Sequence, residues 1–323
     1  MSLPLDEQPV LSVSDLRHLA AVQEGVISRD QLLRAGYPPG FGRGKVRSGT
    51  WRRLFRGVYL TNSGAITSGA TMWAALLAAP PGAVLGGATA AALDGWREHG
   101  RGPLELVVPH ESGTVTRLAG VRVRRQRRPI QDHSVPPRTT IAATAIDLVQ
   151  RVEGEDDVVA IITAAARRLH SVEPLARELA LRGRCRHRSL VAQLLTPGEA
   201  GHESTLEWRF TRRVIRAHGL PEPIRQLVGT VSGRPIRGDQ VAEIFRTRFE
   251  LDGRVHLDKA DDDVWRDNQV LLERAERTLR YRWRHVVGRA CEVALQVESS
   301  YRAGGWSGFA RPCGPGCRVP PRP

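Results

Sequence analysis

An acidic stretch at residues 249–256 carries side chains whose types and spacing could support catalysis. In a β-strand, successive side chains point to opposite faces, so Glu250 and Asp252 would project together from one surface. Eleven residues before Glu250, Asp239 lies near the end of a predicted strand over 234–241. If residues 245–248 form a hairpin loop, Asp239 and Glu250 lie close together on neighbouring strands.

Paired carboxylates on adjacent strands suit a divalent cation. Hard ions such as Mg²⁺ take oxygen ligands, usually one or two carboxylates together with waters and substrate phosphate. An ion of this kind polarises the phosphate and generates hydroxide. Glu203 and Glu207, four apart on a predicted helix, share a face, and either could hold the metal or its water. We therefore expect Mg²⁺ or Mn²⁺ as the cofactor and no organic cofactor.

The elements that must position these residues form a predicted mixed sheet with helices on its faces. Gly253 ends the acidic strand, and clustered carboxylates from Asp258 onward begin the next helix, where negative charge suits the positive end of the dipole. The expected order is helix 199–218, strand 224–230, strand 234–241, strand 247–252, helix 259–276, strand 278–283 and helix 288–302.

These segments resemble, in order and spacing, the C-terminal domain of a bacterial family related to Vsr-type mismatch-repair endonucleases, within the PD-(D/E)xK nuclease fold. The matching segments begin at Glu203, Gly219, Glu250, Arg266 and Thr278 and, with Gln226 and Asp239, lie within about residues 199–317. The resemblance implies that Glu207 or Glu203 is the helix carboxylate. It also implies that Asp239 is the central metal ligand and Glu250 the acidic member of the next strand.

The sequence departs from the usual pattern of this fold at one position. The fold usually carries a lysine two residues after the strand glutamate, and this chain has Asp252 there. His256, Lys259 or Arg266 would have to supply a positive group or a base, and without one the site would not cleave. The candidate catalytic residues are thus Asp239, Glu250, Asp252, Glu207 and His256, and the candidate metal ligands are Asp239, Glu250 and Glu203.

The composition predicts a multidomain protein with a polyanionic partner. A chain of 323 residues is long enough for two or three domains with separate cores. Its formal net charge of +14 favours nucleic acid, because a basic surface raises the local concentration of a polyanion. The first residues lack the basic-then-apolar pattern of a signal peptide, and prolines and glycines interrupt the uncharged span 57–94. We expect a cytoplasmic protein without a membrane span.

Residues 1–64 predict a winged helix-turn-helix. Apolar residues at helical spacing indicate a helix over 14–22 and short helices near 28–36 and 40–48, and residues 51–60 alternate like a strand pair. The region resembles the N-terminal domain of AbiEi-type antitoxins, which share its Gly-Val-Ile-Ser-Arg opening and its Trp…Arg-Gly-Val-Tyr close. The resemblance implies that the third segment meets DNA. The expected phosphate contacts are Arg43, Lys45, Arg47, Arg52, Arg53 and Arg56. The alternative is a solvated basic face.

Residues 65–198 predict an α+β middle domain and a helical connector. Helices are expected at 68–79, 88–96, 140–151 and 156–170, with strands at 104–109 and 120–125 and a connector over 172–195. This unit loosely resembles the second part of AbiEi-like proteins. Arginines 122, 124, 125, 127 and 128 form a basic stripe that is either a solvated sheet face or a nucleic-acid surface.

The nuclease-like domain is expected to end near residue 305, followed by a flexible tail over 306–323. Cys313 and Cys317 lie four apart in this tail, whereas a structural zinc site usually has four ligands. Only Cys291, Cys185 and distant histidines could complete such a set. An unpaired tail is therefore the expectation, with metal binding or a redox pair as alternatives.

Together the patterns predict an α+β and α/β multidomain, DNA-binding protein whose C-terminal domain is a Mg²⁺-dependent endodeoxyribonuclease. The alternative is a non-catalytic DNA-binding regulator or antitoxin of a toxin–antitoxin or phage-defence system, with a cognate toxin as partner. Asp252 at the expected lysine position favours that alternative. A third possibility is an RNA-directed nuclease or a partner-binding protein.

Overall fold

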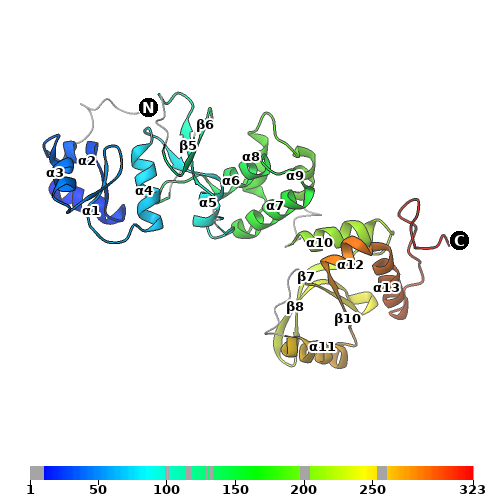
Figure 1. Ribbon diagram of the computed structural model, residues 1–323. Coiled ribbons are helices and arrows are strands. Elements are labelled where there is room, and N and C mark those ends of the chain that lie inside the picture. The colour runs from blue at the N-terminus through cyan, green and yellow to red at the C-terminus, as the bar shows by residue number, and fades with distance from the viewer. Residues whose placement is uncertain are drawn as a thin grey trace. The chain divides into compact units, whose positions relative to one another are not determined.

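The computed structural model describes residues 11–98, 100, 102–113, 118–128, 130, 134–196, 204–252 and 260–322. Over these residues the chain is a mixed α+β protein with three sheets, which confirms the α+β part of the predicted class (Figure 1). It divides into two compact units, Met1–Arg151 and Val152–Pro323, each described separately below. No helix within the described ranges is long and apolar enough to cross a membrane.

The N-terminal unit begins with three short helices and a small antiparallel sheet of order β1-β3-β2. The elements are α1 (Val13–Val22), β1 (Val26–Ser28), α2 (Arg29–Arg34), α3 (Phe41–Arg47), β2 (Arg52–Phe55) and β3 (Val58–Leu60). Ser12 and Ser28 cap α1 and α2, because each hydroxyl accepts a bond from the amide three residues later. Helix α3 packs closely on the sheet at Gly42, where a Cβ would lie 2.6 Å from the Tyr59 ring.

The same unit continues with a second sheet of order β4-β5-β6. Its elements are α4 (Ser68–Ala78), β4 (Val84–Leu85), α5 (Gly87–Leu93), β5 (Leu104–Pro109), β6 (Val121–Gln126) and α6 (Ile141–Val149). Two arginines of the predicted basic stripe, both on β6, contact other parts of the protein. Arg124 pairs with Asp147, and Arg125 donates to the carbonyl oxygens of His110 and Gly113 at 2.9 and 2.7 Å. These contacts tie down two arginines of the stripe.

The C-terminal unit contains a four-stranded mixed sheet of order β10-β9-β8-β7, parallel only between β9 and β10. Helices α7 (Glu155–Leu169), α8 (Glu173–Ala180) and α9 (Arg188–Leu194) precede α10 (Thr205–Phe210), which continues as a π-helical segment η2 (Thr211–Arg216). There follow β7 (Ile224–Val231), β8 (Arg234–Ala242), the 3-10 turn η3 (Glu243–Phe245), β9 (Thr247–Asp252), α11 (Ala260–Arg274), β10 (Arg277–Arg282), α12 (Trp283–Gly288) and α13 (Ala290–Ala303).

The two faces of this sheet have different covers (Figure 1). Helices α10, α12 and α13 pack on one face around Phe210, Phe249 and Tyr301, whose rings are in contact. Helix α11 covers the other face, where Val270 meets Val231. Because side chains alternate along β9, the residues next to Phe249 in sequence point toward the α11 side.

The structure differs from the sequence analysis in several details. The division lies after Arg151, so α7–α9, which were assigned to the middle domain and its helical connector, belong to the C-terminal unit, where α7 packs on α10. The expected hairpin loop at 245–248 is the earlier turn η3, and residues 247–248 are already strand. The predicted flexible tail is instead packed, because Ala310 and Val319 are buried in the core around Phe249.

Candidate functional site

Strands β8 and β9 bring Asp239 and Glu250 opposite each other. Their last paired residues are Gln240 and Phe249, so positions 239 and 250 come next, where the two strands part. The Leu251 amide, which has lost its strand partner there, donates to Asp239 Oδ2 at 2.8 Å. Gln240 points toward η2, since its Nε2 donates to Thr211 Oγ1 at 3.0 Å. Asp239 and Glu250 therefore share the α11 side of the sheet.

Burial and a neighbouring carboxylate set the proton affinity of Glu250. Only 8% of this residue is exposed. Burial first, and the nearby Asp239 charge second, raise the pKa of Glu250 from 4.5 to about 7. Arg266, Arg280 and Arg248 oppose this rise, and Arg266 Nη2 lies 3.9 Å from the Glu250 carboxylate. Ionising both carboxylates in this buried site therefore costs free energy, and a nearby positive charge lowers that cost.

Arg280 of β10 supplies a fixed cation on the same face. The parallel register places Arg280 beside Glu250 and Arg282 beside Asp252. The Arg280 guanidinium donates from Nε to Asp267 Oδ2 at 2.8 Å, and its Nη1 lies 3.5 Å from Asp252 Oδ2. Asp252, at the position where a lysine was expected, is therefore paired with an arginine from the next strand. The sequence analysis named Arg266 as a source of positive charge and missed Arg280.

Glu207 is buried on α10, the helix whose Phe210 ring lies 5.0 Å from the Phe249 ring, centre to centre. Its Oε2 accepts a hydrogen bond from Gln226 Nε2 at 3.0 Å. Glu203 and His256, together with Lys259, fall outside the described residues. The structure thus brings together Asp239 and Glu250, with Asp252 two residues further along the same strand face.

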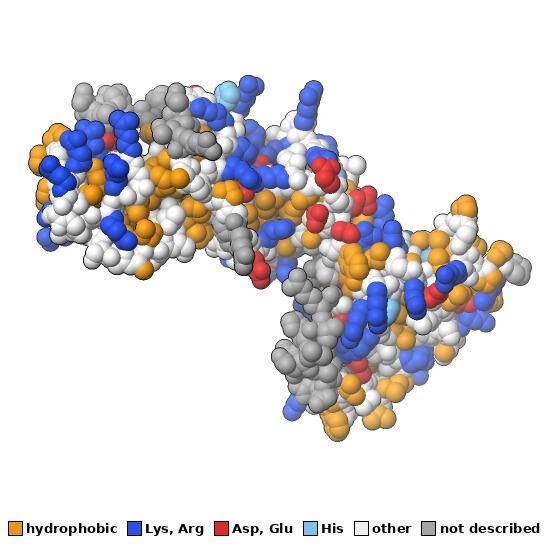
Figure 2. Space-filling model, viewed as in Figure 1, with side chains coloured by type: hydrophobic (Ala, Val, Ile, Leu, Met, Phe, Trp, Pro, Cys, Tyr) orange, Lys and Arg blue, Asp and Glu red, His pale blue; other side chains and the backbone are white. Residues whose placement is uncertain are grey.

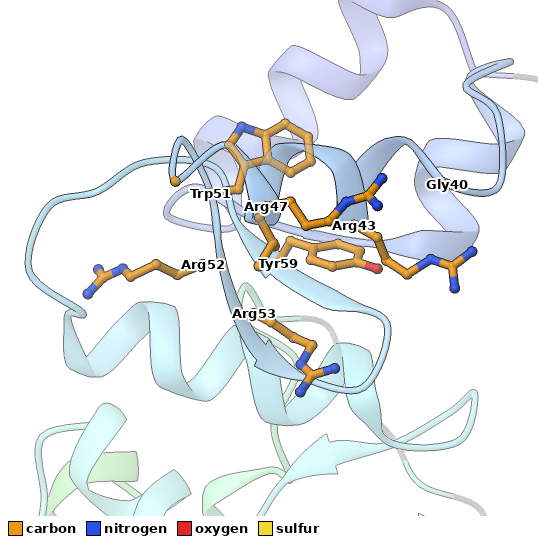
Figure 3. A pocket seen from close by; sticks show the side chains of 9 residues that line it. Gly40, Arg43, Arg47, Trp51, Arg52, Arg53 and Tyr59 are labelled. Atoms are coloured by element: carbon orange, nitrogen blue, oxygen red, sulfur yellow. The ribbon is translucent and has the colours of Figure 1, made fainter.

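A second candidate site is a basic depression on the N-terminal unit, between α3 and the β2–β3 hairpin (Figure 3). Its lining residues include no acidic side chain and are Gly40, Arg43, Val46, Arg47, Gly49, Trp51, Arg52, Arg53 and Tyr59. Arg43 and Arg47 lie one helical turn apart on α3 and are exposed. Figure 2 shows the basic side chains (blue) that are prominent on the visible face of this unit.

The six predicted phosphate contacts differ in how far they extend from the protein. Arg53 and Arg56 are exposed along the hairpin, like the two α3 arginines. Lys45 is half-buried, and its Nζ lies 5.5 Å from the centre of the Phe41 ring. Arg52 is half-buried and donates to the Gly64 carbonyl. Four of the six side chains therefore extend into solvent, and two have contacts within the protein.

The comparisons with known proteins assign no family. No protein-family model and no curated protein matches the chain. Among solved structures, the crystal structure of the RV2827C protein from Mycobacterium tuberculosis matches 58% of this chain and 78% of its own, at 20% identity and a TM-score of 0.38. A likeness of this degree assigns neither fold nor function, and the functional argument therefore depends on the residues above.

Proposed function

We propose that the protein binds DNA and hydrolyses its phosphodiester bonds with a divalent cation held by Asp239 and Glu250. The observation that carries the proposal is the placement of these two carboxylates on adjacent strands, facing each other where β8 and β9 part. Such a placement agrees with the resemblance to Vsr-type nucleases, in which the same two positions hold the metal.

The residues present fit a cation such as Mg²⁺ or Mn²⁺. Both carboxylates are hard oxygen donors, the type that these ions prefer. The pKa of Glu250, raised to about 7 by burial and by Asp239, indicates that the pair resists carrying two charges by itself. A dication would favour the doubly ionised pair, polarise a phosphodiester and lower the pKa of a bound water. Glu203 is a third candidate ligand from the resemblance.

The chain's own cations complete the proposed site. Arg280 and Arg266 lie next to Glu250 and would attract the phosphate backbone and orient it toward the carboxylates. In this proposal Arg280 takes over the electrostatic part of the expected lysine, because it reaches the same face from the next strand. Asp252 holds the Arg280 guanidinium, and His256 remains the candidate base from the sequence.

The N-terminal unit would supply most of the affinity for DNA. Three helices followed by a β-hairpin, with β1 completing the sheet, have the element order of a winged helix. In that arrangement α3 enters the major groove, and the exposed Arg43, Arg47, Arg53 and Arg56 contact phosphates. The depression between α3 and the hairpin, lined by arginines and without carboxylates, supports this assignment.

A second candidate is a non-catalytic DNA-binding regulator or antitoxin that keeps the nuclease-like domain as a binding module. The specific observation in its favour is Asp252, which stands at the lysine position and accepts from Arg280 at 3.5 Å. An arginine paired with Asp252 and Asp267 is less available to a substrate phosphate than a free lysine. Its partner would be a cognate toxin.

A nicking assay separates the two candidates. The purified full chain should nick supercoiled DNA with Mg²⁺ or Mn²⁺ and lose this activity with EDTA. Asp239→Asn should abolish nicking while preserving the fold, because the asparagine Oδ1 can still accept from the Leu251 amide. Glu273→Gln, an exposed carboxylate change on α11, is the matched control and should nick like the wild type. DNA binding without nicking would favour the regulator, and equal nicking by Asp239→Asn would indicate a contaminating nuclease.

A further inference from the structure

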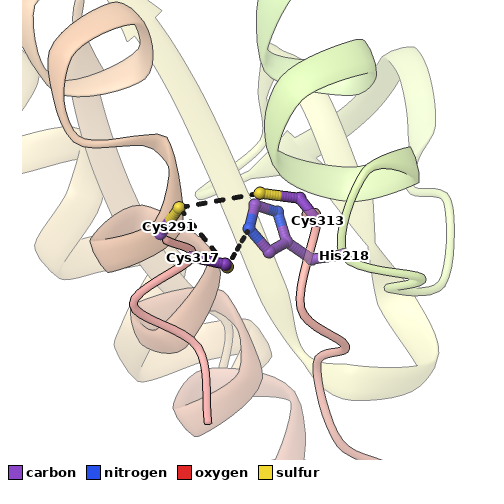
Figure 4. Close-up of side chains that lie close together, drawn as sticks. All are labelled: His218, Cys291, Cys313 and Cys317. Atoms are coloured by element: carbon purple, nitrogen blue, oxygen red, sulfur yellow. Dashed lines mark hydrogen bonds between the residues drawn. The ribbon is translucent and has the colours of Figure 1, made fainter. Parts of the chain in front are cut away.

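Three cysteines and one histidine from separate segments meet at the surface of the C-terminal unit (Figure 4). His218 follows η2, Cys291 lies in the first turn of α13, and Cys313 and Cys317 belong to the segment after α13. One ligand atom from each residue lies within 4.8 Å of the others. The cluster lies outside the carboxylate site and consists of softer donors.

Three of the distances within this cluster are close to those of tetrahedral coordination. Cys291 Sγ lies 3.6 Å from Cys317 Sγ and 3.8 Å from Cys313 Sγ, and Cys317 Sγ lies 3.7 Å from His218 Nε2. A tetrahedral zinc ion, with bonds of about 2.3 Å to sulfur and about 2.0 Å to nitrogen, holds sulfurs about 3.8 Å apart and sulfur and nitrogen about 3.5 Å apart. A disulfide requires a separation of about 2.05 Å, and all three cysteines are free.

His218 has the orientation of a metal ligand. Its side chain is fully buried, and Nδ1 lies 3.0 Å from the Val214 carbonyl oxygen. Because a carbonyl oxygen only accepts, Nδ1 carries the proton and Nε2 presents its lone pair to Cys317. Metal-bound histidines are usually fixed in this way, with the second ring nitrogen donating to a carbonyl or a carboxylate.

The three thiols and the imidazole are donor types that a zinc ion takes. Thiolate is the metal-binding form of cysteine, and a dication in contact with all three sulfurs would favour that form for each of them.

Backbone hydrogen bonds and buried apolar side chains also position the donors. Cys313 and Cys317 flank a Gly-Pro-Gly turn, in which Gly316 has a φ of +76° and the Cys317 amide bonds the Gly314 carbonyl at 3.2 Å. On either side of the turn, Ala310 and Val319 are buried in the core. The Arg311 amide also donates to the His218 carbonyl at 2.7 Å, which ties this segment to the histidine.

We propose that His218, Cys291, Cys313 and Cys317 bind one structural Zn²⁺ ion that fastens the segment after α13 to the C-terminal unit. Four protein ligands leave no open position, as in structural rather than catalytic zinc sites. Three thiolates and one imidazole also favour zinc over Mg²⁺ or Ca²⁺, which take oxygen donors. The proposal does not depend on whether the carboxylate site cleaves DNA.

Metal analysis of the untagged full chain tests the proposal. Purified without chelator, it should contain one zinc per chain by inductively coupled plasma mass spectrometry. The double variant Cys313→Ser/Cys317→Ser should fall to background, and Cys185→Ser, a cysteine outside the cluster, should keep one zinc. Cobalt substitution of the wild type should give the intense visible bands of tetrahedral Co²⁺ and a thiolate-to-cobalt charge-transfer band. His218→Gln should shift or weaken both.

The wild-type protein also decides the question if the variants do not fold. Removal of zinc by a strong chelator should lower the melting temperature, and stoichiometric zinc should restore it. Wild-type chain that contains no zinc and takes up none on titration, with three cluster thiols that still react with a thiol reagent, would overturn the proposal. A Cys291–Cys317 or Cys291–Cys313 disulfide in protein purified without reductant, together with absent zinc, would overturn it in favour of a redox pair.

Discussion

The raised pKa of Glu250 predicts that Glu250→Gln stabilises the metal-free C-terminal unit at neutral and alkaline pH. In the unfolded chain this carboxyl titrates near 4.5, and in the fold near 7, because of burial and of Asp239. Arg266, Arg280 and Arg248 face the group and already limit the rise. The difference between 4.5 and 7 corresponds to about 3 kcal/mol of unfolding free energy, because each pKa unit is worth about 1.4 kcal/mol.

The sign follows from which state holds the proton. Below pH 4.5 both states are protonated, so Glu250 imposes no cost. Between about pH 4.5 and 7 the folded state binds more protons than the unfolded chain, so the stability contributed by this group falls as the pH rises. Above pH 7 the full cost of about 3 kcal/mol is present. A glutamine side chain does not ionise, so Glu250→Gln should gain up to this amount at pH 8 and nothing below pH 4.5.

Hydrogen–deuterium exchange of the β9 peptide measures the stability of the C-terminal unit separately from that of the N-terminal unit. The wild type, Glu250→Gln and the exposed control Glu273→Gln should be compared with EDTA between pH 4.5 and 8, after correction for intrinsic exchange rates. Only Glu250→Gln should show protection of this peptide, relative to the wild type, that increases with pH. Mn²⁺ should then stabilise the wild type at pH 8 and leave Glu250→Gln unchanged. A difference that is absent or independent of pH would refute the reasoning that burial and Asp239 raise the pKa of Glu250 in the fold.

Two further predictions concern other charges. Glu276, paired with Arg248 at 3.0 Å and Arg274 at 2.8 Å, is buried, so Glu276→Gln should lower the unfolding free energy in urea by about 3–5 kcal/mol. Arg248→Met should cost less, since Arg274 still pairs with Glu276, and the reverse order would contradict this account. In the N-terminal unit, Arg43→Gln and Arg47→Gln should each reduce the slope of log affinity for DNA against log salt by about 1, measured by fluorescence anisotropy. Unchanged slopes would remove α3 from the DNA interface.

The sequence by itself predicted the parts of the site that depend on local periodicity. Alternation along residues 247–252 was enough to place Glu250 and Asp252 on one face, because every residue of a strand reverses direction. The short separation from Asp239 was enough to predict an antiparallel neighbour, and the structure has that pairing with the turn shifted to residues 243–245. The helices and hairpin of the first 60 residues were predictable from the same kind of local periodicity.

Only the tertiary structure decided which distant residues complete each site. Arg280 reaches Glu250 because β10 returns parallel to β9 after a helix, and no local pattern specifies that register. The metal-ligand cluster depends on the packing of the last segment. Because Ala310 and Val319 are buried in the core, Cys313 and Cys317 lie next to His218, which is about a hundred positions earlier in the sequence. Contacts between residues distant in sequence are set by hydrophobic burial, which is not directional. Contacts within one helix or strand are set by the short repeat of the backbone, which can be read from the sequence.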